Sequence, residues 1–235
     1  MTQLALPLRL ADHAVFDSFL PNGNEELLAQ LAAIAADPNE SGCWLWGGAA
    51  AGKTHLLQAV CERAGDRSVY VPLAILADAG PGLIDGLDSR DVVCIDDIQT
   101  IAGNEAWEGA LFTLYNELIA AGARLVVAAT TAPRECPFEL PDLASRMSHL
   151  PTYLVQMLAD TDRAEALQLR ASHRGLDLPD ETASYLLSRS RRDMTSLYEV
   201  LDNLDEAALR AQRKLTVPFV REVLQQMAVQ SDATD

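Results

Sequence analysis

The chain has 235 residues, of which 49% are hydrophobic, and its formal net charge is −16 at pH 7. This length allows one large α/β domain or two small ones, with enough apolar residues for a proper core. A surface this acidic repels a phosphate backbone, which argues against direct, sequence-specific binding to DNA. No apolar run is long enough to cross a bilayer, and the first residues lack the basic start and apolar core of a signal peptide.

The cysteines are scattered without the spacing of a metal site, at Cys43, Cys61, Cys94 and Cys136. We interpret them as reduced packing residues, which is typical of a cytoplasmic protein.

Residues 1–13 are predicted to form a separate, extended N-terminal segment. Pro7 is incompatible with a helix interior and biases Leu6 toward an extended conformation. Residues 24–36, which are rich in Leu and Ala, then predict the first helix.

An apolar strand over 43–46 leads directly into Gly47-x-x-x-x-Gly52-Lys53-Thr54, the pattern of a phosphate-binding P-loop. Its glycines let successive backbone N–H groups point at phosphate oxygens, Lys53 would reach the β and γ phosphates, and the Thr54 hydroxyl would ligate Mg²⁺. A helix is predicted over 53–64, ended by Gly65. The residues predicted to hold ADP or ATP here are Gly47, Gly48, Ala51, Gly52, Lys53, Thr54 and His55.

Further strands are predicted over 68–72, 91–95 and 124–129, with an amphipathic helix over 105–121 between the last two. Continuous apolar strands that alternate with helices indicate a parallel sheet covered on both faces.

The strand over 91–95 runs into two acidic residues, which is Walker B chemistry. Asp96 would hold Mg²⁺, directly or through water, and Asp97 would orient or deprotonate the attacking water. The strand over 124–129 is followed by Thr130 and Thr131, and Thr131 could lie beside the γ-phosphate. A plain loop start before Pro133 explains the two threonines equally well, so both interpretations stay open.

From about residue 157 the pattern becomes helical, and helices are predicted over 160–173, 180–189, 193–211 and 217–228. We therefore expect an α/β P-loop NTPase domain over 14–156, with a parallel sheet, followed by a small all-helical lid domain over 157–230.

The motifs resemble those of the AAA+ ATPases, and within them of the initiator DnaA. Gly52-Lys-Thr-His-Leu-Leu57 and Ile95-Asp-Asp-Ile-Gln99 carry this resemblance, as does Val15-Phe-Asp-Ser-Phe19. The chain resembles even more the Hda family of DnaA-related regulators. That resemblance rests on Leu143-Ala-Ser-Arg-Met147, Ala166-Leu-Gln-Leu-Arg-Ala171 and Ala211-Gln-Arg-Lys-Leu-Thr-Val-Pro-Phe-Val-Arg221.

The resemblance assigns roles to further residues. Arg146 matches the arginine finger, which would enter the nucleotide site of a neighbouring subunit. Arg192 matches the sensor 2 arginine of the lid, which would touch the nucleotide bound by the same chain. Residues 3–8 resemble the hexapeptide that docks on the replicative sliding clamp, with contacts expected from Gln3, Leu4, Leu6, Pro7 and Leu8.

The resemblance implies a negative regulator of DNA replication initiation. Together with the DNA-loaded sliding clamp, such a protein stimulates hydrolysis of the ATP bound to DnaA by supplying Arg146 in trans. The main alternative is a self-hydrolysing AAA+ helicase or clamp loader or remodeller, because the P-loop lysine, Lys53, is present. Asp97 stands where vigorous AAA+ motors have Glu, which favours a nucleotide-binding switch over a fast ATPase. A small P-loop kinase is less compatible with the helical region after the sheet. The state of assembly, including a homo-oligomer, is left open.

Overall fold

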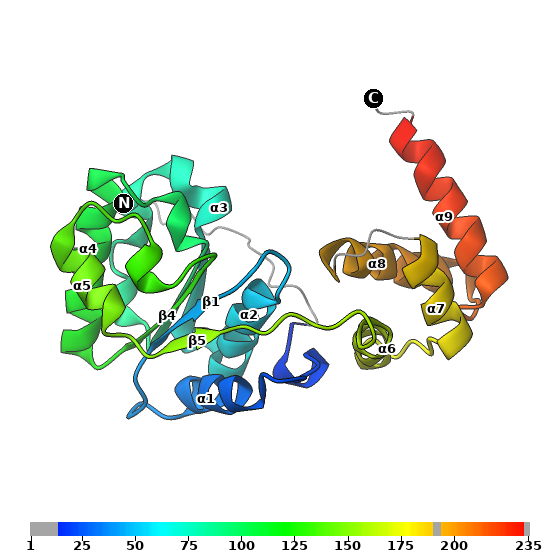
Figure 1. Ribbon diagram of the computed structural model, residues 1–235, viewed down its shortest axis with the longest axis horizontal. Helices are drawn as coiled ribbons and strands as arrows, with labels where there is room; N and C mark the ends of the chain where they lie inside the picture. Colours follow the sequence, from blue (N-terminus) through cyan, green and yellow to red (C-terminus); the bar gives the residue numbers. More distant parts are fainter. Residues whose placement is uncertain (1–13, 190–193, 233–235) are drawn as a thin grey trace. The chain divides into compact units, whose positions relative to one another are not determined.

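The computed structural model describes residues 14–189 and 194–232, which divide into two compact units (Figure 1). The first unit comprises Pro21–Met157 and the described residues that precede Ser18. The second comprises Ser18–Leu20 and the chain from Leu158 onward.

The first unit is built on a five-stranded sheet in the order β2-β3-β4-β1-β5. Its strands are β1 (Cys43–Trp46), β2 (Ser68–Pro72), β3 (Val92–Asp96), β4 (Arg124–Ala129) and β5 (Thr152–Leu154). Every pairing in the sheet is parallel, which confirms the predicted architecture. The short edge strand β5 was not predicted, because it has three residues and none of them is fully buried.

Helices cover both faces of this sheet (Figure 1). The helices α1 (Glu25–Ala36) and α2 (Lys53–Ala64) pack on one face, and α4 (Glu105–Ala121) and α5 (Pro141–Ser148) pack on the other. Side chains alternate along the strands, so Val93 and Ile95 join the core beneath α4 while Cys94 and Asp96 face α2. Strand and helix bounds agree closely with those predicted, but α5 was not foreseen.

Between β2 and β3 the chain forms the short helix α3 (Leu73–Leu76) and several single turns of 3₁₀ helix. Among the residues that the structure describes, the 3₁₀ turns are Phe16–Ser18, Gly65–Arg67, Ala77–Ala79, Pro81–Ile84, Leu87–Ser89, Ile98–Thr100 and Pro133–Glu135.

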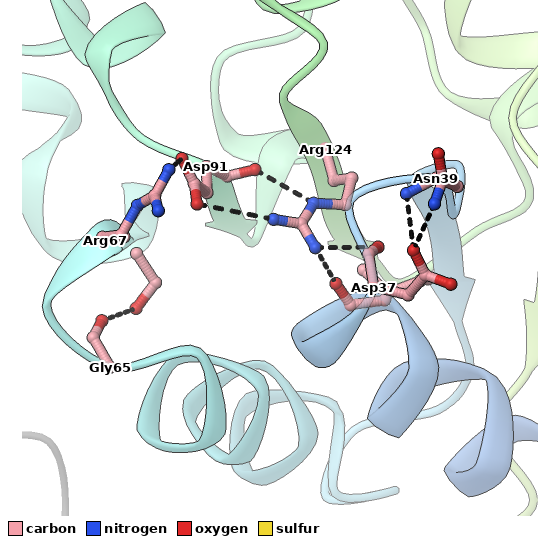
Figure 2. Close-up of polar contacts among 8 residues, drawn as sticks. Asp37, Asn39, Gly65, Arg67, Asp91 and Arg124 are labelled. Atoms are coloured by element: carbon pink, nitrogen blue, oxygen red, sulfur yellow. Dashed lines mark hydrogen bonds and ion pairs between the residues drawn. The ribbon is translucent and has the colours of Figure 1, made fainter.

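Arg124, the first residue of β4, joins three elements at the amino-terminal edge of the sheet (Figure 2). Its Nη1 donates to the carbonyl oxygens of Ile34 at 2.6 Å and Asp37 at 2.9 Å, at the end of α1. Its Nε donates to the carbonyl oxygen of Asp91, whose carboxylate also pairs with Arg67. Arg124 is only 5% exposed, so water has little access to this site. Its guanidinium therefore supplies the donors for carbonyl groups that the end of α1 leaves unpaired.

The second unit is helical, with α6 (Arg163–His173), α7 (Asp180–Arg189), α8 (Met194–Ala211) and α9 (Val217–Asp232). Its apolar core includes Leu167, Leu201 and Val220. The guanidinium of Arg170 lies 4.2 Å from the ring centre of Tyr198, and burial lowers the pKa of this arginine. In the part of the chain that the structure describes, no helix is long and apolar enough to span a membrane.

Candidate nucleotide-binding site

The loop between β1 and α2 has the backbone conformation of a phosphate cradle. Gly52, at the N-cap of α2, has a φ of 97°, which a residue with a Cβ rarely adopts. A Cβ on Gly47 would lie 2.9 Å from the carbonyl oxygen of Val155, and one on Gly48 would lie 3.0 Å from Sδ of Met157. Gly52 is therefore required by the turn and Gly47 by close packing, whereas the exposed, flexible side chain of Met157 can move to make room at Gly48.

The ammonium group of Lys53 folds back into this loop. It donates hydrogen bonds to the carbonyl oxygens of Gly47 at 2.8 Å and Gly48 at 2.9 Å, and the residue is 7% exposed. Desolvation lowers its pKa, while the nearby carboxylates of Asp96 and Asp97 oppose that shift. An anion in the loop would offer this buried cation a stronger partner than two neutral carbonyl groups.

The carboxylate of Asp96 is the centre of a polar network between the P-loop and the sheet. Its Oδ2 accepts hydrogen bonds from the Thr54 hydroxyl at 2.7 Å and from the Tyr70 hydroxyl at 2.9 Å. Asp96 is 2% exposed, and desolvation raises its pKa, which the hydrogen bonds from Thr54 and Tyr70 counteract. A carboxylate and a hydroxyl side by side are ligands that Mg²⁺ accepts, so the two residues predicted to hold the metal do lie together.

Asp97 is held in a left-handed backbone conformation, with φ of 54° and ψ of 43°. Its Oδ1 accepts a hydrogen bond of 3.0 Å from the side-chain amide of Gln99. The Gln99 side-chain oxygen in turn accepts from the backbone N–H of Thr130 at 3.2 Å. Gln99 therefore ties the second acid after β3 to the chain that leaves β4.

Two other predicted site residues have partners outside the phosphate loop. The carbonyl oxygen of Thr131 accepts a hydrogen bond from the indole of Trp44, while its Oγ1 is buried without a partner among the described residues. Nε2 of His55 lies 2.9 Å from the carbonyl oxygen of Val15, so this ring fixes the segment that precedes α1. Ala51 is buried at the end of the loop.

Arg146 lies on the other face of the sheet, in the last turn of α5. The side chain is exposed, and its guanidinium carbon is 5.9 Å from the ring centre of Tyr115 on α4. Within residues 14–189 and 194–232, none of the ion pairs involves Arg146. The helix that carries it and the helix that begins at the P-loop cover opposite faces.

The remaining predicted contacts lie outside the described residues: Arg192, and the N-terminal residues Gln3, Leu4, Leu6, Pro7 and Leu8.

Sequence reasoning missed Tyr70, Gln99 and Asn24. Asn24 exchanges two hydrogen bonds with the backbone of Gln156, which fixes the start of α1 against the chain that leaves β5. Gln99 lies within the motif that the sequence singled out, but its role depends on Thr130, 31 residues further along the chain.

The comparisons with known proteins agree with this geometry. The family model of the bacterial DnaA ATPase domain matches residues 82–151, and that of the Hda lid domain matches residues 160–224.

Among solved structures, domain III of the replication initiation protein DnaA from Thermotoga maritima superposes with a TM-score of 0.71 at 18% identity. It covers 92% of this chain and 97% of that one. AMPPCP-bound DnaA from Aquifex aeolicus gives a TM-score of 0.66 at 22% identity, over 83% of this chain and 65% of that one. A RuvB variant from Thermotoga maritima gives 0.64 at 18% identity, over 90% of this chain and 71% of that one.

The fold is that of an AAA+ protein, an α/β nucleotide-binding fold followed by a helical lid. In its fold and in these two matched segments, the chain resembles the DnaA and Hda proteins.

Proposed function

We propose that this protein is a nucleotide-binding regulator that represses DNA replication initiation by acting on the initiator DnaA. Two features support the proposal. The lid region matches the Hda lid model over residues 160–224, and the base region matches the DnaA ATPase domain. In this proposal the α/β domain over 14–156 binds the nucleotide, and Arg192 of the helical lid domain over 157–230 would contact it as a sensor 2 arginine.

The nucleotide is ADP or ATP, held by the P-loop. On binding, the Lys53 ammonium would donate to phosphate oxygens in place of the carbonyl oxygens of Gly47 and Gly48. Backbone N–H groups of the loop would donate to the remaining phosphate oxygens. Thr54 and Asp96 hold Mg²⁺, which supplies charge neutralisation for the phosphates. Asp97 and Thr131 lie at the ends of adjacent strands, where they would face the γ-phosphate.

The observation that carries the proposal is the state of Arg146. This arginine is exposed, its guanidinium lies over the ring of Tyr115, and none of the ion pairs among the described residues involves it. A guanidinium presented in this way can enter the nucleotide site of a neighbouring DnaA and stabilise charge on its γ-phosphoryl group.

The sliding clamp is the second proposed partner, engaged by residues 3–8. A short extended segment with apolar side chains at Leu4, Leu6 and Leu8 docks without any preformed surface on the folded domains. Loading of the clamp on DNA would then restrict the regulator to times that follow DNA synthesis.

The test is hydrolysis of radiolabelled ATP bound to DnaA, with and without this protein and clamp loaded on DNA. Stimulation is expected only when both are present. The Arg146→Ala variant should lose about 10³-fold or more of the stimulated rate, the range that arginine fingers contribute elsewhere. Arg134→Ala, at an exposed arginine in the 3₁₀ turn Pro133–Glu135, is the matched control and should stimulate normally. Normal stimulation by Arg146→Ala would refute the trans mechanism.

The second candidate is a self-hydrolysing AAA+ helicase or clamp loader or remodeller. The observation that favours it is the complete set of Lys53, Asp96 and Asp97. It predicts sustained turnover of ATP by the isolated protein, abolished by Lys53→Ala and independent of DnaA, whereas the regulator predicts at most a weak intrinsic ATPase.

A further inference from the structure

Glu108, near the start of α4, is a buried carboxylate that the nucleotide site does not use. It is 0% exposed, and all three of its hydrogen bonds come from backbone N–H groups of two loops. Oε1 accepts from Gly103 at 2.6 Å and from Glu139 at 3.1 Å, and Oε2 accepts from Leu140 at 2.6 Å. A buried acid with this many charge-assisted bonds fixes the backbone that donates them.

The backbone that Glu108 holds leads directly into the helix of Arg146. Leu140 is the N-cap residue of α5, and its side chain makes no capping hydrogen bond. Glu108, although it belongs to α4, therefore caps the start of α5, because its carboxylate accepts a hydrogen bond from the N–H group of the N-cap residue. Leu143 and Met147 seat the helix on the same core.

A second contact between α4 and α5 lies near the carboxyl end of α5, between Tyr115 and Arg146. Tyr115 follows Glu108 by seven residues on α4, and Arg146 follows Leu140 by six along α5. At a rise of about 1.5 Å per residue, these spacings are about 10 Å and 9 Å. The buried ring of Tyr115 lies under the Arg146 guanidinium. Residues of α4 therefore contact α5 both at its start, through Glu108, and near its end, through Tyr115, and the two contacts are about equally far apart along each helix.

We propose that Glu108 is a positioning residue for Arg146. It sets the start of α5 against α4, so that the helix delivers the guanidinium over Tyr115 and out toward the partner. The inference rests on the proposed action of Arg146 in trans. According to this inference, the position of the Arg146 guanidinium depends on the buried carboxylate of Glu108 on α4 as well as on the loop before α5.

The test uses Glu108→Gln in the full chain. The amide keeps one acceptor oxygen but turns an NH₂ group toward a backbone N–H, so the start of α5 loses a bond. The maximal rate of stimulated DnaA ATP hydrolysis should fall about ten- to a hundredfold, as expected when a reacting group is displaced by about 1 Å. ADP affinity should stay within twofold, and exchange of the Glu139 and Leu140 amide hydrogens should accelerate.

A general loss of stability is separated from positioning by two controls. Ile34→Val, a buried change in α1 on the other face of the sheet, should lower the melting temperature without changing stimulation. Tyr115→Leu removes the ring beneath the guanidinium but leaves Glu108 intact, and it should reduce the stimulated rate as Glu108→Gln does. Glu108→Asp, which keeps the charge but shortens the reach to the Glu139 and Leu140 N–H groups, should lower the stimulated rate in the same way and keeps the inference testable if Glu108→Gln does not fold.

The decisive comparison is made in the Arg146→Ala background. If Glu108 acts through Arg146, adding Glu108→Gln there causes no further loss of rate. A further loss of the same size as in the parent would overturn the inference. Normal stimulation by both Glu108→Gln and Tyr115→Leu, with Arg146→Ala inactive, would also overturn it while the proposed function stands. If Arg146→Ala itself stimulates normally, the proposed function fails and the inference fails with it.

Discussion

The Thr54 hydroxyl donates a 2.7 Å hydrogen bond to the Asp96 carboxylate, although the two residues are 42 positions apart in the chain. This bond joins the first turn of α2 to the end of β3. It places the two oxygen ligands proposed for Mg²⁺ next to the loop that Lys53 closes. The polar groups of the site are thus assembled by the order of the strands.

The first prediction concerns Lys53, the buried cation of the P-loop. Lys53→Ala should weaken ADP and ATP binding at least tenfold, since a hydrogen bond to a charged group contributes about 1.5–3 kcal/mol. Titration calorimetry measures the change. The chain has one other lysine, the exposed Lys214, and Lys214→Ala is the control with unchanged affinity. Equal affinities of Lys53→Ala and the parent would remove the P-loop assignment.

The second prediction is a pH dependence that originates at Asp96. Burial raises the pKa of this carboxyl above its value in the unfolded chain, about 3.9. The folded chain therefore holds more protons between these two values, and its stability falls as the pH rises through that window. Asp96→Asn cannot titrate, so in buffer without nucleotide or Mg²⁺ it should gain stability relative to the parent from about pH 4 upward.

Urea unfolding of both proteins across a pH series measures this difference in the free energy of unfolding. Below about pH 3.9 the carboxyl is protonated in both states, and the difference should level off there. A difference that shrinks as the pH rises would show that burial of Asp96 carries no energetic cost.

The third prediction concerns Arg124, at the amino-terminal ends of the strands, opposite to the proposed nucleotide site. Arg124→Met keeps the length of the side chain but leaves the carbonyl groups of Ile34 and Asp37 without their donor. The free energy of unfolding should fall by about 3 kcal/mol or more, because each buried carbonyl group left without its donor costs about 1–3 kcal/mol. Denaturant unfolding tests this, and the exposed Arg63→Met is expected to change stability by less than about 0.5 kcal/mol.

The fourth prediction concerns the N-terminal segment. Substitution of both Leu6 and Leu8 by alanine should abolish clamp binding, because these side chains are the proposed apolar anchors. Nucleotide affinity and melting temperature should not change. Leu10→Ala, just outside residues 3–8, is the control that keeps the clamp in a pull-down. Retention of the clamp by the double variant would move the docking site onto the folded domains.

Several local features could be predicted because their signals lie within a few consecutive residues. The P-loop needs glycines at fixed offsets from Lys53, and the strands that end at Trp46, Asp96 and Ala129 are continuous apolar runs. The strand β5 and the helix α5 were missed for the opposite reason. The strand has three partly exposed residues, and the helix has eight, of which only Leu143 and Met147 are buried.

The sequence by itself determined the chemistry of the chain: a phosphate loop, two acids after a buried strand, a parallel sheet and a helical region after it. Only the tertiary structure decided which side chains complete that chemistry. Tyr70 meets Asp96 across 26 residues, and Glu108 meets Leu140 across 32. Such pairs leave no periodic pattern, because each hydrogen bond forms only after strand order and helix packing have brought two distant backbone segments together.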